Sequence, residues 1–265
     1  MASHNCDLCG ASARTEIEPG ISVCMGCGFV YVPERRNSME IAKAWSEVYA
    51  SGAYDPEWPG VKARLYYVAE WIEQNLGLAG KSILDIGAGL GVFLEQVRAR
   101  GGHPVGLEPD LANVAYIKSQ DIACFHGAIE DHSNLGQYDI VSLLWTLENC
   151  GDCLRMLRWA RRHLAPGGRV VVATGSRVLV PYKKPYGAYF GTLSPDLHCF
   201  RWSCNAIRGA FGCAGLLGGA QNDYLQNDVM LAVAEAGHAS GHSMAYTDVP
   251  EAVIDFFREW KRQWP

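Results

Sequence analysis

Apolar and polar residues follow two alternating patterns over the middle of the chain. Short apolar runs predict strands at Ser82–Ile86, Pro104–Leu107, Ile122–His126, Ile140–Leu144 and Arg169–Thr174. Stretches between them predict helices at Gly91–Arg100, Leu111–Lys118 and Cys153–His163. Pro166-Gly167-Gly168 predicts a stop before the fifth strand. Because the strands lack strict polar–apolar alternation, the pattern favours a doubly wound α/β fold, with a parallel sheet covered on both faces.

The same patterns divide the chain into four zones. They are a cysteine-rich module (residues 1–33), a helical linker or cap (34–80), the α/β domain (81–249) and a C-terminal helix (250–265). In the linker, helical spacing is shown by Val68, Trp71, Ile72 and Leu76. Beyond residue 220 we expect a last hairpin before the terminal helix.

The C-terminal helix is predicted to be amphipathic. Its apolar face carries Val253, Phe256, Phe257 and Trp260. Such a stripe must be covered, and packing against the core of the same chain is the favoured interpretation. A homodimer contact and a position over a binding site are both compatible with a helix at the end of a chain.

Composition narrows the classes of function. Of 265 residues, 49% are hydrophobic and 19% charged, and the formal net charge is −5. This balance supports a folded core and disfavours a nucleic-acid partner, because phosphate binding relies on a basic surface. We see no secretory signal and no apolar run of about 18 residues, so we expect a cytoplasmic protein without a membrane partner. In that setting the ten cysteines are expected to be metal ligands or buried thiols.

A glycine-rich run follows the first predicted strand. In Asp85-Ile86-Gly87-Ala88-Gly89-Leu90-Gly91, the glycines allow a tight turn and a close approach of backbone N–H groups to a ligand. The spacing is G-x-G-x-G, which differs from the G-x-G-x-x-G of dinucleotide sites. The adjacent Asp85 would disfavour a pyrophosphate but would favour a ligand bearing an ammonium or sulfonium group.

Candidate cofactor residues follow the next strands. Glu108 ends the second strand, where a carboxylate can accept hydrogen bonds from both hydroxyls of a ribose. Ala128 and Ile129, after the third strand, are candidates for the wall of an adenine site. Two further candidates stand at the ends of the second and fourth strands, Pro109 and Leu144.

These motifs together resemble those of class I S-adenosylmethionine-dependent methyltransferases. The resemblance covers residues 81–220 and includes Leu164-Ala165-Pro166-Gly167-Gly168 before a Val-rich strand. It implies a Rossmann-like sheet of seven strands whose last strand is antiparallel. It further implies S-adenosyl-L-methionine as cofactor, with Gly87 and Gly89 against its methionine part, Glu108 on its ribose, and Ala128 and Ile129 beside its adenine.

Two C-x-x-C pairs mark the N-terminal module. The pairs are Cys6/Cys9 and Cys24/Cys27, separated by 14 residues and each followed by Gly. Four thiolates make a closed tetrahedral site, for which zinc is favoured over iron, so residues 1–33 are expected to form a zinc ribbon with a structural Zn²⁺. The alternatives are four free thiols or two disulfides.

A third C-x-x-C lies at Cys150 and Cys153. His198, Cys199 and Cys204 could complete a second metal site with it. No matching knuckle is present, so buried thiols are the favoured interpretation.

Residues after the fourth and fifth strands face the acceptor in enzymes of this family. After the fourth strand stand Trp145 and Glu148, without the Asn/Asp-Pro-Pro-Tyr/Phe of amino-methylating enzymes. Glu148 is a candidate base or substrate ligand, although an acid stabilised by a helix dipole is an alternative role. The aromatic segment after the fifth strand offers Tyr182 and Tyr186 as acceptor-binding candidates, unless these aromatics merely cover the sheet.

His198 is the first candidate for the general base, ahead of Glu148. An imidazole can take a proton from a hydroxyl or an acidic carbon, although a structural histidine is the alternative. The chain resembles bacterial methyltransferases of sugar and natural-product pathways, and His198 falls on the last His of their Tyr-His-Glu-His run. Pro195, Asp196 and Leu197 depart from that run. We therefore expect C- or O-methylation of a small-molecule acceptor, such as a sugar, sugar nucleotide or natural-product intermediate.

Two other functions compete with this one. A zinc-containing RNA methyltransferase would use the basic cluster of Arg155, Arg158, Arg161 and Arg162. A non-catalytic binding protein that kept the fold is the other alternative, and the intact glycine run and Glu108 argue against it.

Overall fold

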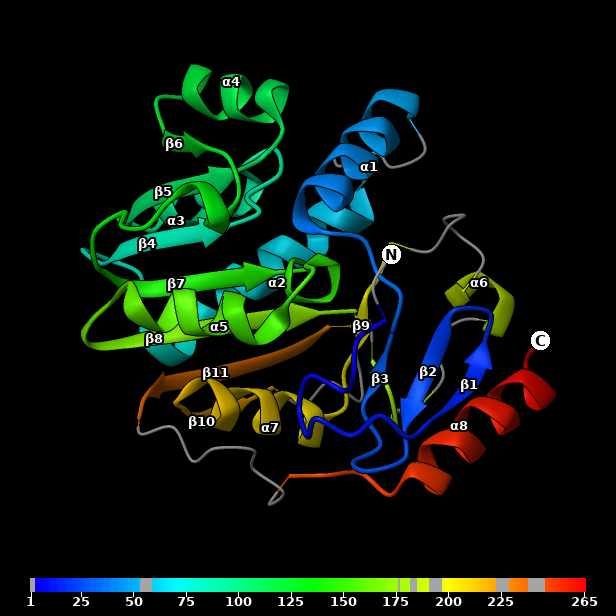
Figure 1. The fold of residues 1–265 in the computed structure, drawn as a ribbon. Coiled ribbons are helices and arrows are strands. Elements are labelled where there is room, and N and C mark those ends of the chain that lie inside the picture. The colour runs from blue at the N-terminus through cyan, green and yellow to red at the C-terminus, as the bar shows by residue number, and fades with distance from the viewer. Residues whose placement is uncertain are drawn as a thin grey trace.

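The structure is a computed structural model, and it describes residues 3–52, 59–175, 177–181, 185–190, 197–222, 229–237 and 246–265. Within these residues, seven strands form one sheet in the order β10-β11-β8-β7-β4-β5-β6 (Figure 1). Their bounds are β4 Ser82–Ile86, β5 His103–Glu108, β6 Ala123–His126, β7 Tyr138–Leu144, β8 Leu164–Thr174, β10 Leu216–Gln221 and β11 Met230–Ala236. Strand β11 runs antiparallel to both of its neighbours, whereas β4 to β8 are mutually parallel. The predicted seven-stranded α/β sheet with an antiparallel last strand is confirmed.

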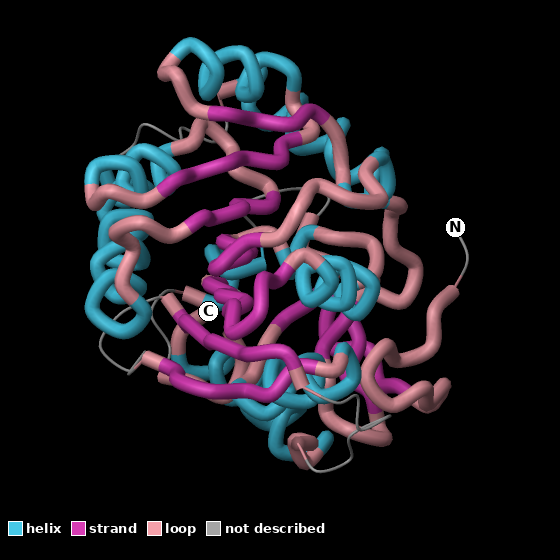
Figure 2. Tube along the Cα trace, turned by 90° about the vertical axis from the view of Figure 1, so that its left-hand side faces the viewer, coloured by secondary structure: helices cyan, strands magenta, loops and turns pink. Residues whose placement is uncertain are grey.

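Helices cover both faces of this sheet, as the apolar strands require (Figure 2). On one face pack α5 (Cys153–Arg162) and α7 (Cys204–Ala214), and on the other α2 (Pro59–Leu76) and α3 (Val92–Ala99). Alternate residues of β8 serve the two layers, since Val170 and Val172 face the first and Val171 the second. Helix α4 (Leu111–Ser119) packs beside β5 and β6.

The Pro166-Gly167-Gly168 segment is a bulge within a strand rather than a stop before one. Strand β8 begins at Leu164, which pairs with Tyr138, and the register then shifts so that Arg169 pairs with Ile140. The extra residues leave the ladder between these pairs, which requires Gly167 to adopt a positive φ of 78°. The last hairpin also begins earlier than expected, because its first strand, β10, starts at Leu216.

A second sheet joins the N-terminal module to the α/β domain. Among the described residues its strand order is β1-β2-β3-β9, with all pairs antiparallel. The first three strands are β1 (Arg14–Glu18), β2 (Ile21–Cys24) and β3 (Val30–Tyr31). The fourth, β9 (Phe200–Arg201), comes from the segment after β8, and Figure 1 shows β9 beside β3. We call this four-stranded sheet the ribbon sheet; its last strand was not expected from the sequence.

Helix α8 (Pro250–Gln263) packs on the ribbon sheet. Its buried residues Val253, Phe257 and Trp260 share an apolar cluster with Ile21 and Val23 of β2. The short helix α6 (Tyr186–Phe190) belongs to the same cluster. The apolar stripe of the C-terminal helix is therefore covered by its own chain.

Helix α1 (Ser38–Ser51) begins at an Asn37 cap, where the Asn37 side chain accepts a hydrogen bond from the Glu40 N–H and the Glu40 carboxylate accepts one from the Asn37 N–H. Two short 3₁₀ turns, η1 (Ile129–Asp131) and η2 (Leu147–Asn149), follow β6 and β7. None of the helices in the described part of the chain has the length and apolarity needed to cross a membrane.

Candidate active site

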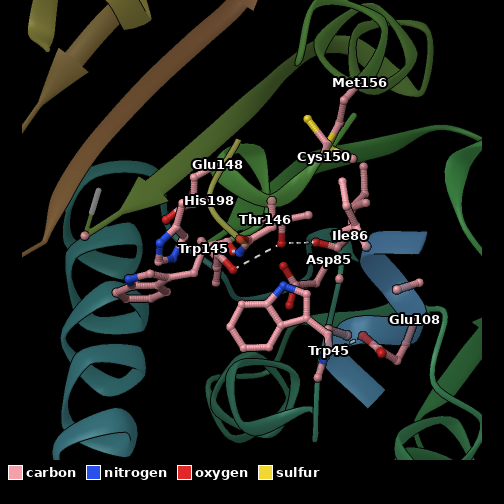
Figure 3. Close-up of a pocket in the computed structure, with 18 of the residues that line it drawn as sticks. Trp45, Asp85, Ile86, Glu108, Trp145, Thr146, Glu148, Cys150, Met156 and His198 are labelled. Carbon is pink, nitrogen blue, oxygen red and sulfur yellow. Dashed lines mark hydrogen bonds between the residues drawn. The ribbon is translucent and has the colours of Figure 1, made fainter. Parts of the chain in front are cut away.

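The carboxyl ends of the parallel strands open into a cavity of about 630 Å³ (Figure 3). Loops after β4, β5, β6, β7 and β8 line it, together with parts of α1, α2, α6 and α8. This position follows from the topology, because right-handed crossovers place all these strand ends along one edge of the sheet. The volume is within the range of small-molecule sites.

The glycine-rich run forms the floor of one end of the cavity. Gly87, Gly89 and Gly91 all have positive φ, at 74°, 55° and 76°. The Gly87 N–H donates to the Leu107 carbonyl, which fixes the turn against β5. A side chain at Gly87 would meet the Thr146 hydroxyl, since an added Cβ would lie 2.6 Å from its Oγ1. Glycine is therefore required here by both backbone conformation and space.

Gly91, the third glycine of the run, caps a helix beside the cavity. It is the N-cap of α3 and is not among the residues that line the cavity, whereas Gly87, Ala88 and Gly89 are. An added Cβ at Gly91 would lie 2.8 Å from Cγ1 of Ile117, so this glycine allows α3 to pack against α4.

Asp85 lies buried at the end of β4 beside the glycines. Its side chain is 2% exposed, and Oδ1 accepts a hydrogen bond of 2.6 Å from the Ser142 hydroxyl. Burial raises the pKa of the Asp85 carboxyl to about 7, a rise that the Ser142 hydrogen bond partly opposes. A cationic ligand in the cavity would favour the ionised form.

Glu108 faces the cavity from the end of β5. Its Oε2 accepts a hydrogen bond of 2.8 Å from the Gly89 N–H, and its Oε1 one of 3.0 Å from the Asp110 N–H. Burial raises the pKa of this carboxyl to about 7 as well, against the effect of these two donors. Each oxygen keeps a further lone pair for a ligand hydroxyl, so the carboxylate fits a ribose.

The other expected cofactor residues line the same end. They are Pro109, Ala128, Ile129 and Leu144. Two aromatic residues of α1, Trp45 and Tyr49, also line the cavity and were not expected from the sequence. The Asn37 cap predicts the helix, but nothing in the sequence tells which of its faces meets the sheet edge.

Glu148 and His198 line the other end of the cavity. Glu148 is fully buried in η2, and its Oε1 accepts a hydrogen bond of 2.7 Å from the Thr174 hydroxyl. Figure 3 shows its carboxyl facing the imidazole of His198. Burial raises the pKa of the Glu148 carboxyl, and electrostatic attraction by His198 partly opposes this rise.

Glu148 stands in the first turn of η2, which has only three residues, and not at the N-terminus of a longer helix. The residue lies in η2, before α5 begins at Cys153, and Asp152 caps that helix by accepting from the Arg155 N–H. A fully buried carboxyl that faces an imidazole across a cavity wall attracts that imidazole electrostatically and favours its protonated form.

Aromatic side chains from distant segments line the same end. Trp145 lines the cavity and has a left-handed backbone, with φ of 55°, in which its N–H donates to the Ala173 carbonyl. This rare conformation for a bulky residue directs the chain into η2. Tyr189 of α6 and Phe256 and Trp260 of α8 complete the wall.

The two tyrosines expected to bind the acceptor are not part of this wall as described. Tyr182 lies outside the described residues, as do Lys183 and Lys184. Tyr186 does not line the cavity; its hydroxyl donates to Oε1 of Glu18 in β1 at 2.6 Å. Both tyrosines of α6 belong to the apolar cluster of the ribbon sheet and α8, and only Tyr189, almost one turn further along the helix, also lines the cavity.

The four cysteines of the N-terminal module converge. Their sulfur atoms all lie within 4.8 Å of one another, with 3.5 Å between Cys6 and Cys27 and 3.4 Å between Cys9 and Cys24. These separations are too long for disulfides. Metal–sulfur bonds of about 2.3 Å give a tetrahedral site with edges of about 3.8 Å, so the cluster fits a zinc ion. The Gly26 N–H also donates to the Cys24 sulfur.

The remaining cysteines form no comparable cluster among the described residues. All ten cysteines of the chain are described and none forms a disulfide, and Cys150, Cys153 and Cys199 are buried. Burial raises the pKa of the Cys150 and Cys153 thiols, so they are expected to stay protonated. This agrees with the expectation of buried thiols.

Part of the chain is similar in sequence to known methyltransferases. Ubiquinone biosynthesis O-methyltransferase of Pseudomonas aeruginosa is 32% identical over 117 residues, which are 40% of this chain and 50% of that protein. The chain thus spans about half the length of the curated relatives it matches.

Two solved structures share the fold at low sequence identity. One is a chain of the complex between the Haloferax volcanii Trm112 methyltransferase activator and a methyltransferase, with TM-score 0.59 and 20% identity, covering 71% of this chain and 97% of that one. The other is the Burkholderia thailandensis 1,6-didemethyltoxoflavin-N1-methyltransferase with bound S-adenosylhomocysteine. Its TM-score is 0.56 at 12% identity, and the match covers 85% of this chain and 100% of that one.

The family model described as a methyltransferase domain matches residues 61–216, which is more than half of the chain. These residues include the first five strands of the large sheet, the glycine-rich run and Glu108. The chain therefore belongs to the methyltransferase-domain family, and its fold is that of the class I S-adenosylmethionine-dependent enzymes.

Proposed function

We propose that this protein transfers the methyl group of S-adenosylmethionine to an oxygen of a small, ring-bearing acceptor. The observation that carries the proposal is one cavity with two chemically different ends. Glycines and buried carboxyls line one end, and a histidine–carboxylate pair among aromatic side chains lines the other.

The first end suits the cofactor. Glu108 would accept hydrogen bonds from the ribose hydroxyls, and Ala128 and Ile129 would lie beside the adenine. Gly87 and Gly89 leave room for the methionine part close to the backbone, while Asp85 favours its positive charge. When bound, the sulfonium supplies a methyl group already activated for displacement.

At the other end, the chain's own residues would align the acceptor and remove its proton. His198 would take the proton from the acceptor hydroxyl as the new oxygen–carbon bond forms and the sulfur–carbon electron pair stays on sulfur. Glu148 would hold the imidazole in place and stabilise its protonated form. General-base assistance of this kind typically contributes about 10²–10⁴-fold to the rate.

Aromatic walls define the class of acceptor. Trp145, Tyr189, Phe256 and Trp260 offer ring faces that can stack on a flat ring or on the apolar face of a sugar. We therefore propose a natural-product or sugar-type acceptor. O-methylation is favoured over C-methylation because a histidine–carboxylate pair is suited to deprotonating a hydroxyl.

The cysteine cluster is proposed to hold a structural zinc ion. Four sulfur ligands complete a tetrahedral site and leave no open position for chemistry. The module has only short strands of its own, so metal binding would supply much of its folding free energy.

An RNA acceptor is less well supported. Two of the four clustered arginines make hydrogen bonds within the chain. Arg158 donates to the Cys213 carbonyl, and Arg161 donates to the Gly237 carbonyl. Arg155 lies 3.7 Å from the Glu130 carboxylate. These contacts reduce the basic surface that phosphate binding requires.

Calorimetry and turnover assays test the proposal in sequence. The metal-loaded protein should bind S-adenosylmethionine and its demethylated product. It should then release that product when offered a panel of phenols, hydroxylated heterocycles and sugar nucleotides. Binding without transfer to any class would favour a non-catalytic binding protein, and absence of binding would refute the proposed function. Zinc content near one per chain by elemental analysis, lost in Cys24→Ser, would support the metal site.

A further inference from the structure

The segment that carries His198 continues directly into the ribbon sheet. His198 is followed by Cys199 and then by β9, whose residues Phe200 and Arg201 pair with Tyr31 and Val30 of β3. The histidine thus lies two residues before a strand that pairs with the N-terminal module, and Trp202, directly after this strand, forms a β-bridge with Arg177.

The backbone of Cys199 links the ribbon sheet to Glu148. Its carbonyl accepts a hydrogen bond of 2.9 Å from the Val32 N–H, one residue beyond β3. Its own N–H donates to the Glu148 carbonyl at 2.7 Å. The backbone of Cys199, next to His198, is therefore held by two hydrogen bonds, one to the residue after β3 and one to the backbone of Glu148.

Arg201 adds a second restraint on the same segment. Its side chain is 1% exposed, and Nη1 donates to the His198 carbonyl at 3.2 Å. The guanidinium also lies over the Phe190 ring, 4.9 Å from its centroid, and 5.8 Å from that of Tyr189. Arg201 thus connects the His198 backbone with an aromatic residue of the cavity wall.

Arg35 connects the cysteine knuckle itself with the Glu148 loop. Its guanidinium donates to Oδ1 of Asp7, which lies between Cys6 and Cys9, and to the carbonyl of Gly151 after η2. It also lies 4.8 Å from the centroid of the Phe200 ring in β9. The metal-ligand loop, β9 and the loop of Glu148 therefore share one buried arginine.

We propose that the ribbon sheet is a positioning element for the reaction: β3 holds β9 in register and thereby sets His198 against Glu148. The inference rests on the proposed role of His198 as the general base. If this inference is right, disturbing the N-terminal module slows the proton-transfer step and leaves the affinity for the cofactor at the glycine-rich end unchanged. Val32, through its N–H, and Arg201 are the positioning residues.

A matched pair of variants tests this role. Val32→Pro removes the N–H that donates to Cys199, whereas Val32→Ala shortens the side chain and keeps the donor. In the metal-loaded protein we expect Val32→Pro to lower kcat by about tenfold to a hundredfold relative to Val32→Ala, as a misplaced catalytic group does. The dissociation constant for S-adenosylmethionine should agree within about twofold between the two, because Val32 does not line the cofactor end.

Hydrogen exchange supplies a readout that does not depend on turnover. Val32→Pro should speed exchange of the Cys199 amide, while the Gly87 amide, which donates to the Leu107 carbonyl, stays protected. Equal kcat and equal Cys199 exchange in the two variants would overturn the inference. Wild-type protein without any methyl transfer would instead count against the proposed function.

Arg201→Lys provides a second test if Val32→Pro does not fold. It keeps the positive charge but shortens the reach to the His198 carbonyl. We expect a lower kcat, a shifted pH profile of kcat and unchanged cofactor affinity. Wild-type kcat and pH profile in this variant would also overturn the inference.

Discussion

The two ends of the cavity are built in opposite ways. The cofactor end comes from loops that directly follow β4, β5 and β6, so chain order and sheet topology bring its residues together. The acceptor end combines η2, the segment of His198, α6 and α8, which are far apart in the sequence. The first depends on local backbone geometry, and the second on packing between the ribbon sheet and the α/β domain. Mutations at the two ends should therefore affect different steps.

The largest effect is expected from His198→Ala. Loss of the base should lower kcat by about 10²–10⁴-fold. The affinity for S-adenosylmethionine should not change, because His198 lies at the other end of the cavity. Steady-state kinetics and calorimetry measure the two quantities, with the exposed His103→Ala as control. Retained turnover would remove His198 from the mechanism.

Glu108→Gln should act on the cofactor end instead. The substitution keeps the shape but loses the charge that strengthens hydrogen bonds from ribose hydroxyls, so we expect affinity to fall by about tenfold to a hundredfold. With saturating cofactor, kcat should stay near that of the wild type. Glu95→Gln on helix α3 is the control. A loss of kcat without a loss of affinity would contradict the division of the cavity.

Gly87→Ala should combine a stability loss with weaker cofactor binding. The left-handed backbone costs alanine about 1–2 kcal/mol, and the new Cβ would also displace Thr146. Gly80→Ala is a matched control, because Gly80 has nearly the same φ, 73°, but nothing within 4 Å of an added Cβ. Thermal unfolding and calorimetry should show weaker binding in Gly87→Ala alone. If both variants lost the same stability and the same cofactor affinity, backbone strain alone would explain the effect, and the contact with Thr146 would have no role.

Cofactor affinity should depend on pH. The pKa values of Asp85 and Glu108 are raised to about 7 by burial, and a cationic ligand with hydroxyl donors prefers both carboxyls ionised. Below pH 7 these two carboxyls are mostly protonated in the free protein and must lose their protons when the cofactor binds, which weakens binding. For one such group, affinity should fall about tenfold from pH 8 to pH 6. Calorimetry in two buffers would detect the released protons; pH-independent binding would contradict this account.

The smallest effect is expected from Phe256→Leu on α8. It removes one aromatic face of the acceptor end, and stacking worth about 0.5–1.5 kcal/mol predicts a rise of about twofold to tenfold in the acceptor KM. Cofactor affinity should be unchanged. Phe125→Leu, which alters a half-exposed ring that does not line the cavity, is the control. An unchanged KM would indicate that the acceptor lies away from α8.

The same contrast explains how much the sequence predicts. The glycine run, Asp85 and Glu108 are identified from the sequence because turns and strand ends need particular residues at fixed spacing. Glu148 and His198 were named as candidates, but their burial and mutual orientation come from tertiary contacts. Tyr189 rather than Tyr186, and Trp45 on α1, line the cavity because of how short helices rotate against their neighbours. Periodicity alone does not encode that rotation.

The pairing of β3 with β9 has a consequence for folding. Strand β3 of the N-terminal module is synthesised well before β9, so its sheet lacks a strand until Phe200 and Arg201 have been made. Until then β3 presents an unpaired edge, which is a site for non-native strand pairing. Contacts so distant in sequence also slow folding. Production of the intact protein should therefore benefit from an early supply of zinc, which would order the cysteine loops while the rest of the chain is made.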